Sequence, residues 1–213
     1  MTLLQFPQSL ADKYRPKRLK DFIGLDKPLA VMKALAKRPY PSAWFFIGAS
    51  GLGKTSLAMA LASEIKGEIH HIPSQHCDLE TIEEETRRCH YVPMNGGFHV
   101  LIVDEADRMS MAAQLALLSK LDATAFPPQT IFIFTANGAR NLEDRFLSRC
   151  RCLVFEQESF TKKLPEYLQR VYKKETRRSI PVTIAAKIAV DSNYNVRDAL
   201  MNLEIEIMMA RAA

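Results

Sequence analysis

The chain has 213 residues, of which 47% are hydrophobic and 25% are charged, and its formal net charge is +5 at pH 7. This composition matches the average soluble protein, and the length suffices for one large domain or for a large domain with a small companion. No apolar run approaches the 18 residues of a membrane span and no signal peptide opens the chain, so we expect a cytoplasmic protein whose four cysteines are free thiols.

Basic side chains are concentrated in two stretches of the sequence. Residues 1–20 carry five basic side chains against one acid, and residues 161–180 carry seven against two. Such patches are compatible with the phosphates of a nucleic acid, but solvated helix faces give the same pattern. Charge alone leaves both interpretations open.

The first predicted strand, residues 43–47, leads into Gly48-Ala49-Ser50-Gly51-Leu52-Gly53-Lys54-Thr55, and a helical pattern follows over residues 57–62. The run fits the P-loop pattern G-x-x-x-x-G-K-[ST], which binds nucleoside triphosphates. We expect phosphate contacts from the loop and the helix start, at Ser50, Gly51, Leu52, Gly53, Lys54, Thr55 and Ser56. Lys54 is expected to neutralise the β- and γ-phosphates, and the Thr55 hydroxyl to bind Mg²⁺.

A second strand is predicted at residues 68–73, and a stretch rich in histidine and cysteine begins within it. The side chains concerned are His70, His71, His76, Cys77, Cys89 and His90. Adjacent residues diverge on a helix or a strand, and neither end of the stretch has the usual gap of two to four residues between zinc ligands. The spacing therefore favours buried cysteines and surface histidines over a zinc site.

A third strand, at residues 98–103, is an apolar run typical of a central parallel strand, and Asp104 and Glu105 follow it. This pattern indicates a Walker B element. Asp104 is expected to hold Mg²⁺ through water, and Glu105 to polarise the water that attacks the γ-phosphate. The alternative is a pair of acidic residues that begin a helix.

Two more strands are predicted at residues 130–135 and 151–155, and three helices at 160–175, 182–190 and 196–210. Strands that alternate with helices predict an α/β fold, here a parallel five-stranded sheet covered by helices. The last three helices have no strand between them and predict a small all-helical domain. We expect domains at 1–156 and 157–213, with a hinge in the short polar stretch 156–159.

Further motifs support a resemblance that covers nearly the whole chain. They are Lys13-Tyr14-Arg15-Pro16 with Asp21-Phe22-Ile23-Gly24 after it, Thr135-Ala136-Asn137, Ser148-Arg149-Cys150, and Asn195-Val196-Arg197-Asp198-Ala199-Leu200. In this order, with the P-loop and Walker B between them, they resemble the AAA+ ATPases. Within that family they are most similar to the clamp-loader subunits, the replication factor C small subunits and the bacterial gamma and tau subunits.

The resemblance implies a role for each motif. Tyr14, Arg15, Ile23 and Gly24 would lie at the adenine, Asn137 would contact the γ-phosphate or the attacking water as sensor 1, Arg149 would reach into the neighbouring subunit's site, and Arg197 would touch the γ-phosphate as sensor 2. Simpler interpretations stay open. Tyr14 and Arg15 can be surface residues, and Asn137 can belong to a turn. Arg145, instead of Arg149, can be the arginine that reaches into the neighbouring subunit's site. Arg197 can form an ion pair with Asp198 or Glu204.

The resemblance further implies an ATPase that uses ATP and Mg²⁺ and acts in DNA replication. The expected partners are further copies of the chain or related AAA+ subunits, a sliding clamp, and primed DNA, with no membrane. The alternatives are another AAA+ DNA-processing motor or helicase loader, and a non-catalytic ATP-binding adaptor. In clamp-loader subunits the small helical domain, called the lid, is followed by a helical collar domain. Because the lid should end at about Ala213, we expect no collar domain within these 213 residues.

Overall fold

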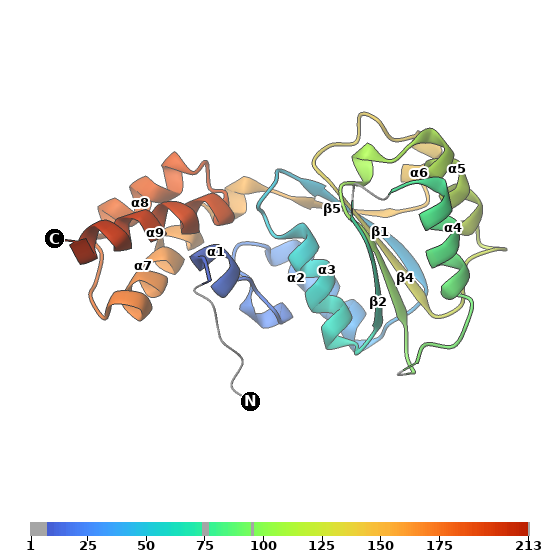
Figure 1. Cartoon of the computed structure of the whole chain (residues 1–213), viewed down its shortest axis with the longest axis horizontal. Coiled ribbons are helices and arrows are strands. Elements are labelled where there is room, and N and C mark those ends of the chain that lie inside the picture. Colours follow the sequence, from blue (N-terminus) through green and yellow to red (C-terminus); the bar gives the residue numbers. More distant parts are fainter. Residues whose placement is uncertain (1–7, 74–76, 95, 213) are drawn as a thin grey trace.

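The computed structural model describes residues 8–73, 77–94 and 96–212, and a parallel five-stranded sheet forms its centre (Figure 1). The strands are β1 (Ser42–Gly48), β2 (Glu68–Ile72), β3 (His99–Val103), β4 (Thr130–Ala136) and β5 (Arg151–Phe155). Their order across the sheet is β2-β3-β4-β1-β5. The predicted parallel sheet is therefore confirmed, and each predicted strand agrees with an observed one to within one residue at either end.

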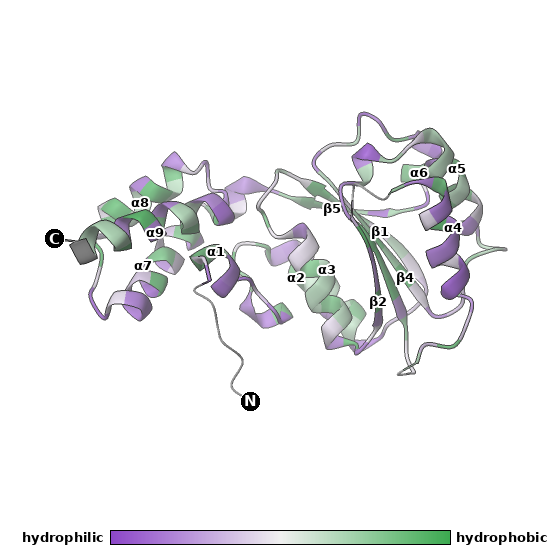
Figure 2. Ribbon diagram, in the orientation of Figure 1, coloured by the Kyte–Doolittle hydropathy of each residue, from purple (hydrophilic) through white to green (hydrophobic). Residues whose placement is uncertain are grey.

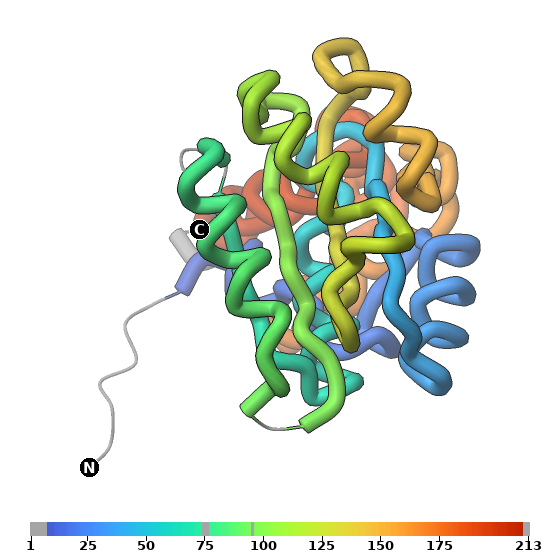
Figure 3. Tube along the Cα trace, turned by 90° about the vertical axis from the view of Figure 1, so that its right-hand side faces the viewer, coloured from blue at the N-terminus to red at the C-terminus, as the bar shows by residue number. Residues whose placement is uncertain are grey.

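Helices cover both faces of the sheet. On one face lie α2 (Asp26–Lys37) and α3 (Lys54–Glu64), and on the other lie α4 (Leu79–Arg88), α5 (Met111–Lys120) and α6 (Asp144–Leu147). Successive strand side chains point to opposite faces, so Phe46 packs on the α3 side and Phe45 on the α5 side. In Figure 3, α4 and α5 lie in front of the strands and the C-terminal helices lie behind them.

Three helices follow the last strand, as predicted: α7 (Lys163–Thr176), α8 (Val182–Asp191) and α9 (Val196–Ala212). They pack together with the short helix α1 (Leu10–Lys13), away from α4–α6 (Figure 1). The described residues also contain single turns of 3₁₀ helix at η1 (Leu19–Asp21), η3 (Ala106–Arg108) and η4 (Gln157–Phe160). No helix in the described part of the chain is long and apolar enough to cross a membrane.

The segment before β1 is tied to the segment after β5 by a close contact at Gly24. This glycine has φ +70°, and a Cβ on it would lie 2.5 Å from Cδ1 of the buried Phe160. Nearby, Lys163 Nζ donates to the Asp26 carboxylate at 2.6 Å. The chain thus needs glycine at position 24 both for its backbone conformation and for the space that it leaves.

The substitution Gly24→Ala is expected to lower the free energy of unfolding by about 2–5 kcal/mol. A left-handed backbone costs an L-residue about 1–2 kcal/mol, and an overpacked methyl group about 1–3 kcal/mol more. Denaturant titration measures the change. Gly138→Ala is the matched control, because no heavy atom lies within 4 Å of a Cβ at that position. A Gly24→Ala protein as stable as this control would contradict the packing described here.

The prediction for the histidine- and cysteine-rich stretch is only partly confirmed. Cys77 and Cys89 are buried, and the four cysteines are free. The prediction of surface histidines is wrong for His70, which faces the α4 side of the sheet and is buried. His71 and His90 are exposed, and His76 lies outside the described residues.

Candidate nucleotide-binding site

The P-loop connects β1 to α3 in a conformation that its glycines permit. Gly51 and Gly53 have φ of +76° and +90°, in the left-handed region that L side chains rarely adopt. A Cβ on Gly51 would collide with the side chain of Asn195, whose Nδ2 donates to the Ser50 carbonyl at 3.0 Å. The loop therefore curls before the N-terminus of α3 and touches the segment that leads into α9.

Lys54, the first residue of α3, is buried and donates to three acceptors. Its Nζ lies 2.6 Å from the Gly48 carbonyl oxygen, 2.8 Å from that of Ala49 and 3.0 Å from Oδ1 of Asn137. Burial lowers the pKa of Lys54 to about 8, against the opposing effect of the nearby carboxylates of Asp107 and Asp104. The ammonium group is thus mostly charged at pH 7, which suits a phosphate ligand.

Asp104 follows β3 and receives three hydrogen bonds. Thr55 Oγ1 and Thr135 Oγ1 donate to its Oδ1 at 2.7 and 2.9 Å, and Nε2 of His71 lies 2.7 Å from its Oδ2. Burial raises the pKa of Asp104, but the hydrogen bonds from His71, Thr55 and Thr135 outweigh burial and hold it below its ordinary value. The group is therefore a carboxylate at neutral pH.

The oxygen atoms around Asp104 fit a magnesium ion. Mg²⁺ prefers oxygen ligands and is usually held by one or two protein groups together with phosphates and water. Thr55 Oγ1 and Asp104 Oδ1 lie 2.7 Å apart and supply such groups. Close by, Oδ1 of Asp107 is buried and has no hydrogen-bond partner among the described residues. A cation or its water shell would compensate these charges.

Glu105 occupies an unusual backbone conformation. Its φ and ψ are 50° and 48°, in the left-handed region, and its N–H donates to Thr135 Oγ1 at 3.3 Å. The carboxylate lies 3.3 Å from Nε of Arg108. Left-handed non-glycine residues are uncommon and cluster at functional sites, since the surrounding structure must compensate their strain.

A cavity of about 510 Å³ lies beside the P-loop, a size typical of small-ligand pockets. Its walls come from the N-terminal motif, the P-loop and α9, a helix in which hydrophobic and hydrophilic residues are mixed (Figure 2). Among the predicted site residues, those that line it are Tyr14, Arg15, Ile23, Gly51, Leu52, Gly53, Ser56 and Arg197. Arg15 Nε also donates to Ser56 Oγ at 3.1 Å, so the opening motif and the P-loop form one wall.

The structure thus brings most of the predicted residues together in two adjoining groups. The cavity forms the first group, and the hydrogen-bonded cluster of Lys54, Thr55, Asp104 and Asn137 forms the second. Gly24 contacts Phe160, which also lines the cavity. The Tyr14 hydroxyl donates to Glu175 of α7 at 2.5 Å, so this side chain contacts the helical region as well.

Arg197 lies at the cavity, near enough to Lys54 for its charge to lower the pKa of that lysine. Among the described residues, it forms no ion pair with Asp198 or Glu204, the alternative that the sequence left open. Its guanidinium group is exposed and can meet a ligand.

Arg149 lies outside both groups of the candidate site. It follows α6, on the face of the sheet that α4 and α5 cover (Figure 1). Its Nη1 donates to the Arg145 carbonyl oxygen at 2.8 Å, and its Nη2 lies 3.8 Å from Asp122 Oδ2. Neither of these contacts involves the P-loop, and the residue is exposed.

Sequence reasoning missed three residues of the cluster. His71 and Thr135 both bind Asp104, and Asp107 influences Lys54. Thr135 stands two residues before Asn137, and this position was the signal available for it. His71 had no local signal, because only the pairing of β2 with β3 brings it to Asp104.

Three comparisons bear on this geometry. Residues 44–157 match the AAA family, described as the ATPase family associated with various cellular activities. The chain is 30% identical over 210 residues to the replication factor C small subunit of Picrophilus torridus, covering 93% of this chain and 62% of that protein. It is 27% identical over 210 residues to the replication factor C small subunit 1 of Pyrobaculum islandicum, covering 95% and 61%.

The chain spans about half to three fifths of the length of the first curated relatives that it matches. Among solved structures, it resembles the Thermotoga maritima RuvB Holliday junction branch migration motor with a TM-score of 0.71. That match covers 92% of this chain and 72% of the other, at 21% identity, which is evidence for a shared fold alone.

Proposed function

The chain belongs to the AAA family of ATPases, and on that premise we propose that it binds and hydrolyses ATP with Mg²⁺ at a site shared between neighbouring subunits. We further propose that this ATPase is part of a clamp-loader-like assembly, which uses ATP to place a ring-shaped sliding clamp on primed DNA. The family supports the first proposal, and the similarity to replication factor C small subunits supports the second.

One observation carries the ATPase proposal: the cavity and the hydrogen-bonded cluster meet at the P-loop. Gly51 and Gly53 line the cavity, while Lys54 and Thr55 belong to the cluster that contains Asp104. A base and ribose in the cavity would place a triphosphate along the loop toward that cluster. The arrangement fits a nucleoside triphosphate better than a mononucleotide without a γ-phosphate.

In this proposal each side chain has a distinct role. The P-loop amides and Lys54 hold the phosphates, and Thr55 and Asp104 hold the metal, Asp104 through water. Bound Mg²⁺ would supply positive charge to the phosphate oxygens. Glu105 orients and polarises the attacking water, and Asn137 positions that water or the γ-phosphate. Through Lys54 and Asn137, the bound nucleotide would connect the P-loop to the end of β4. The P-loop itself contacts Asn195, directly before α9.

The two arginines extend the site beyond the P-loop. We propose that Arg197, from α9, contacts the γ-phosphate of its own subunit, and that residues 157–213 act as a lid hinged near 156–159. Arg149 would complete the site of the adjacent subunit, since its α6 faces away from the chain's own cavity. Because one chain carries both the cis and the trans elements, identical copies or related AAA+ subunits could form the assembly in the cytoplasm.

Contacts to DNA would be made mainly to phosphates. The basic residues of the 161–180 stretch and helix N-termini provide such contacts, which are sequence-independent and strongly salt-dependent. This part of the proposal predicts that binding to primed DNA weakens steeply as the salt concentration rises.

Steady-state ATP hydrolysis, measured against protein concentration with and without primed DNA, tests the proposal, alongside the mass of the protein in solution. We expect a specific rate that rises with protein concentration and rises again with primed DNA and a sliding clamp. A rate independent of concentration would contradict the shared site. Stimulation by forked DNA but not by primed DNA and clamp would point to a helicase loader, and ATP binding without turnover would point to an adaptor.

A further inference from the structure

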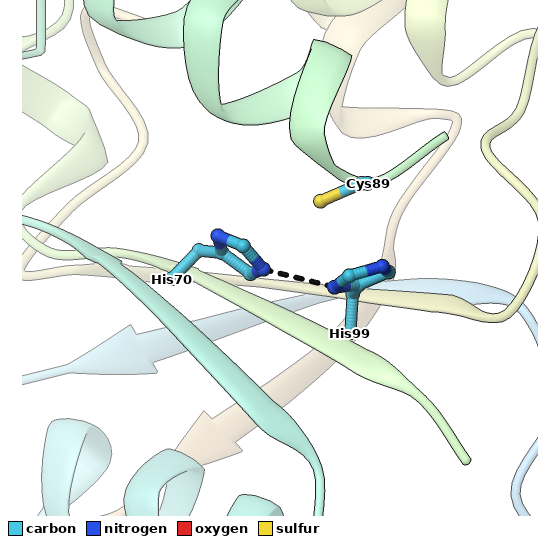
Figure 4. A group of neighbouring side chains, drawn as sticks. All are labelled: His70, Cys89 and His99. Atoms are coloured by element: carbon cyan, nitrogen blue, oxygen red, sulfur yellow. Dashed lines mark hydrogen bonds between the residues drawn. The ribbon is translucent and has the colours of Figure 1, made fainter. Parts of the chain in front are cut away.

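A buried cluster of two histidines and one cysteine lies apart from the nucleotide site, between the sheet and α4. His70 comes from β2, His99 from the start of β3, and Cys89 directly follows α4 (Figure 4). The exposed fractions are 8% for His70, 2% for His99 and 0% for Cys89. One ligand atom from each side chain lies within 4.8 Å of the other two.

The strand register explains why these distant residues meet. Glu68 of β2 pairs with His99 of β3, so His70, two residues further along, lies on the same face of the sheet. The same face carries Leu101, which packs beneath α4 and α5. Cys89, directly after α4, lies above this face, and its sulfur points toward the two imidazole rings (Figure 4). The sequence spacing could not reveal the cluster, because its ligands come from three different elements.

The hydrogen bonds on the outer side of the rings fix the position of each proton. His99 Nε2 lies 2.9 Å from the Tyr91 carbonyl oxygen, which can only accept, so this nitrogen carries a hydrogen. His70 Nδ1 lies 2.8 Å from the Glu85 carboxylate, which also accepts. In two neutral rings the inner nitrogens, His70 Nε2 and His99 Nδ1, therefore both present lone pairs.

These two inner nitrogens lie only 2.9 Å apart. Two lone pairs that face each other at this distance repel, so a positive centre must lie between them, either a proton or a metal ion. For a tetrahedral zinc ion with bonds of about 2.0–2.1 Å, the nitrogens would stand about 3.3 Å apart. The rings need to separate by only a few tenths of an ångström to accept zinc.

The surroundings favour a metal over a proton. Cys89 offers a sulfur ligand, and the Glu68 carboxylate oxygens lie 3.9 Å from His70 Nε2 and 4.0 Å from His99 Nδ1. Two neutral imidazoles, one thiolate and one carboxylate would balance the charge of a divalent ion. Nitrogen and sulfur ligands in a buried tetrahedral set are typical of zinc.

We propose that His70 Nε2, His99 Nδ1 and Cys89 Sγ bind a structural zinc ion, with the Glu68 carboxylate at the fourth position. Glu85 and the Tyr91 carbonyl orient the two rings from outside, as partners of metal-bound histidines commonly do. The ion would tie the edge strand β2 to β3 and to the end of α4. Because His71 on β2 contacts Asp104, the same tie would steady the metal-binding carboxylate of the nucleotide site.

Metal analysis of the purified full chain, without a polyhistidine tag, tests the proposal. We expect about one zinc ion per chain, retained through gel filtration. After exchange for Co²⁺, a thiolate-to-metal charge-transfer band should appear in the near ultraviolet. A wild-type chain that is folded by circular dichroism, yet holds neither zinc nor cobalt, would overturn the proposal and leave a shared proton between the histidines.

Substitutions with matched controls locate the site. Cys89→Ser should remove the charge-transfer band, whereas Cys77→Ser, also buried in the same apolar cluster, should keep it. Glu85→Gln should weaken zinc binding about 10–100-fold, as the loss of an outer partner commonly does. Glu84→Gln is its control, since Glu84 shares the contact to Arg88 but touches neither histidine. Equal zinc affinities for these two glutamine variants would refute the assignment, even if Cys89→Ser fails to fold.

Discussion

Replacing Arg149 with alanine is expected to lower the ATP hydrolysis rate of the assembled protein by about 10³-fold or more, while ATP binding stays almost unchanged. An arginine supplied from a neighbouring subunit delivers its charge to the transition state, and its removal in other nucleotide hydrolases costs about 10³–10⁵ in rate. In the structure, Arg149 is outside the cavity of its own chain. Truncating it should therefore leave that cavity intact. Rates at saturating ATP and the affinity for a fluorescent ATP analogue measure the two effects.

Arg145→Ala is the matched control for this prediction. Arg145 lies on the short helix α6, four residues before Arg149, and its Nη2 is 3.8 Å from the Glu143 carboxylate. It has the same charge as Arg149, and its side chain is the more exposed of the two, at 72% against 35%. A large loss of rate in Arg145→Ala with a small loss in Arg149→Ala would transfer the trans role to Arg145. Loss of ATP binding in Arg149→Ala would instead indicate a role within its own subunit.

The substitution Glu105→Gln is expected to reduce turnover by about 10²–10⁴-fold and to leave ATP bound, because the amide cannot accept a proton from the attacking water. The change is nearly isosteric, so the left-handed turn and the N–H bond to Thr135 should survive. Single-turnover hydrolysis with bound radiolabelled ATP separates the chemical step from binding. An unchanged hydrolysis rate would contradict the proposal that Glu105 polarises the attacking water.

Asp107→Asn decides whether another acid has that role. Asp107 stands two residues after Glu105 and has a buried Oδ1 without a hydrogen-bond partner in the described part of the chain. We expect Asp107→Asn to alter the rate much less than Glu105→Gln. The opposite order would make Asp107 the residue that polarises the water.

Mixing the two inactive variants tests whether the site is shared. In an assembly of Arg149→Ala and Glu105→Gln chains, some interfaces combine an intact Glu105 from one chain with an intact Arg149 from the other. We expect these mixed assemblies to hydrolyse ATP faster than either variant alone. If the measured mass shows that the two variants have formed mixed assemblies and yet no activity is recovered, both residues act within one chain.

Patterns local in the sequence predicted much of the fold. The five strands are apolar runs of ordinary length, and the P-loop is a continuous motif whose glycines have a direct conformational role. Both signals lie within about ten residues, so they need no knowledge of the tertiary structure. The helical segment after β5 was predicted for the same reason.

Residues that depend on strand pairing were not predicted. His71 reaches Asp104, and His70 reaches His99, only because β2 lies beside β3 in one register. A shift of one residue would move every β2 side chain to the opposite face of the sheet. The spacing rule for zinc ligands considers residues that lie close together in the sequence, so it could not find the cluster of His70, Cys89 and His99. The roles given to Asn137, Arg149 and Arg197 came from the family resemblance, and they stay predictions.

The three hydrogen bonds of Lys54 bear on how the proposed nucleotide site is connected to the rest of the sheet. Its ammonium group donates to the carbonyl oxygens of Gly48 and Ala49 and to Oδ1 of Asn137. To meet a phosphate as proposed, Lys54 would give up some of these acceptors, and Asn137, which directly follows β4, is the one that lies farthest from it in the sequence. In the proposed site, the binding of a nucleotide would therefore reach the end of β4 as the loss of the contact between Lys54 and Asn137.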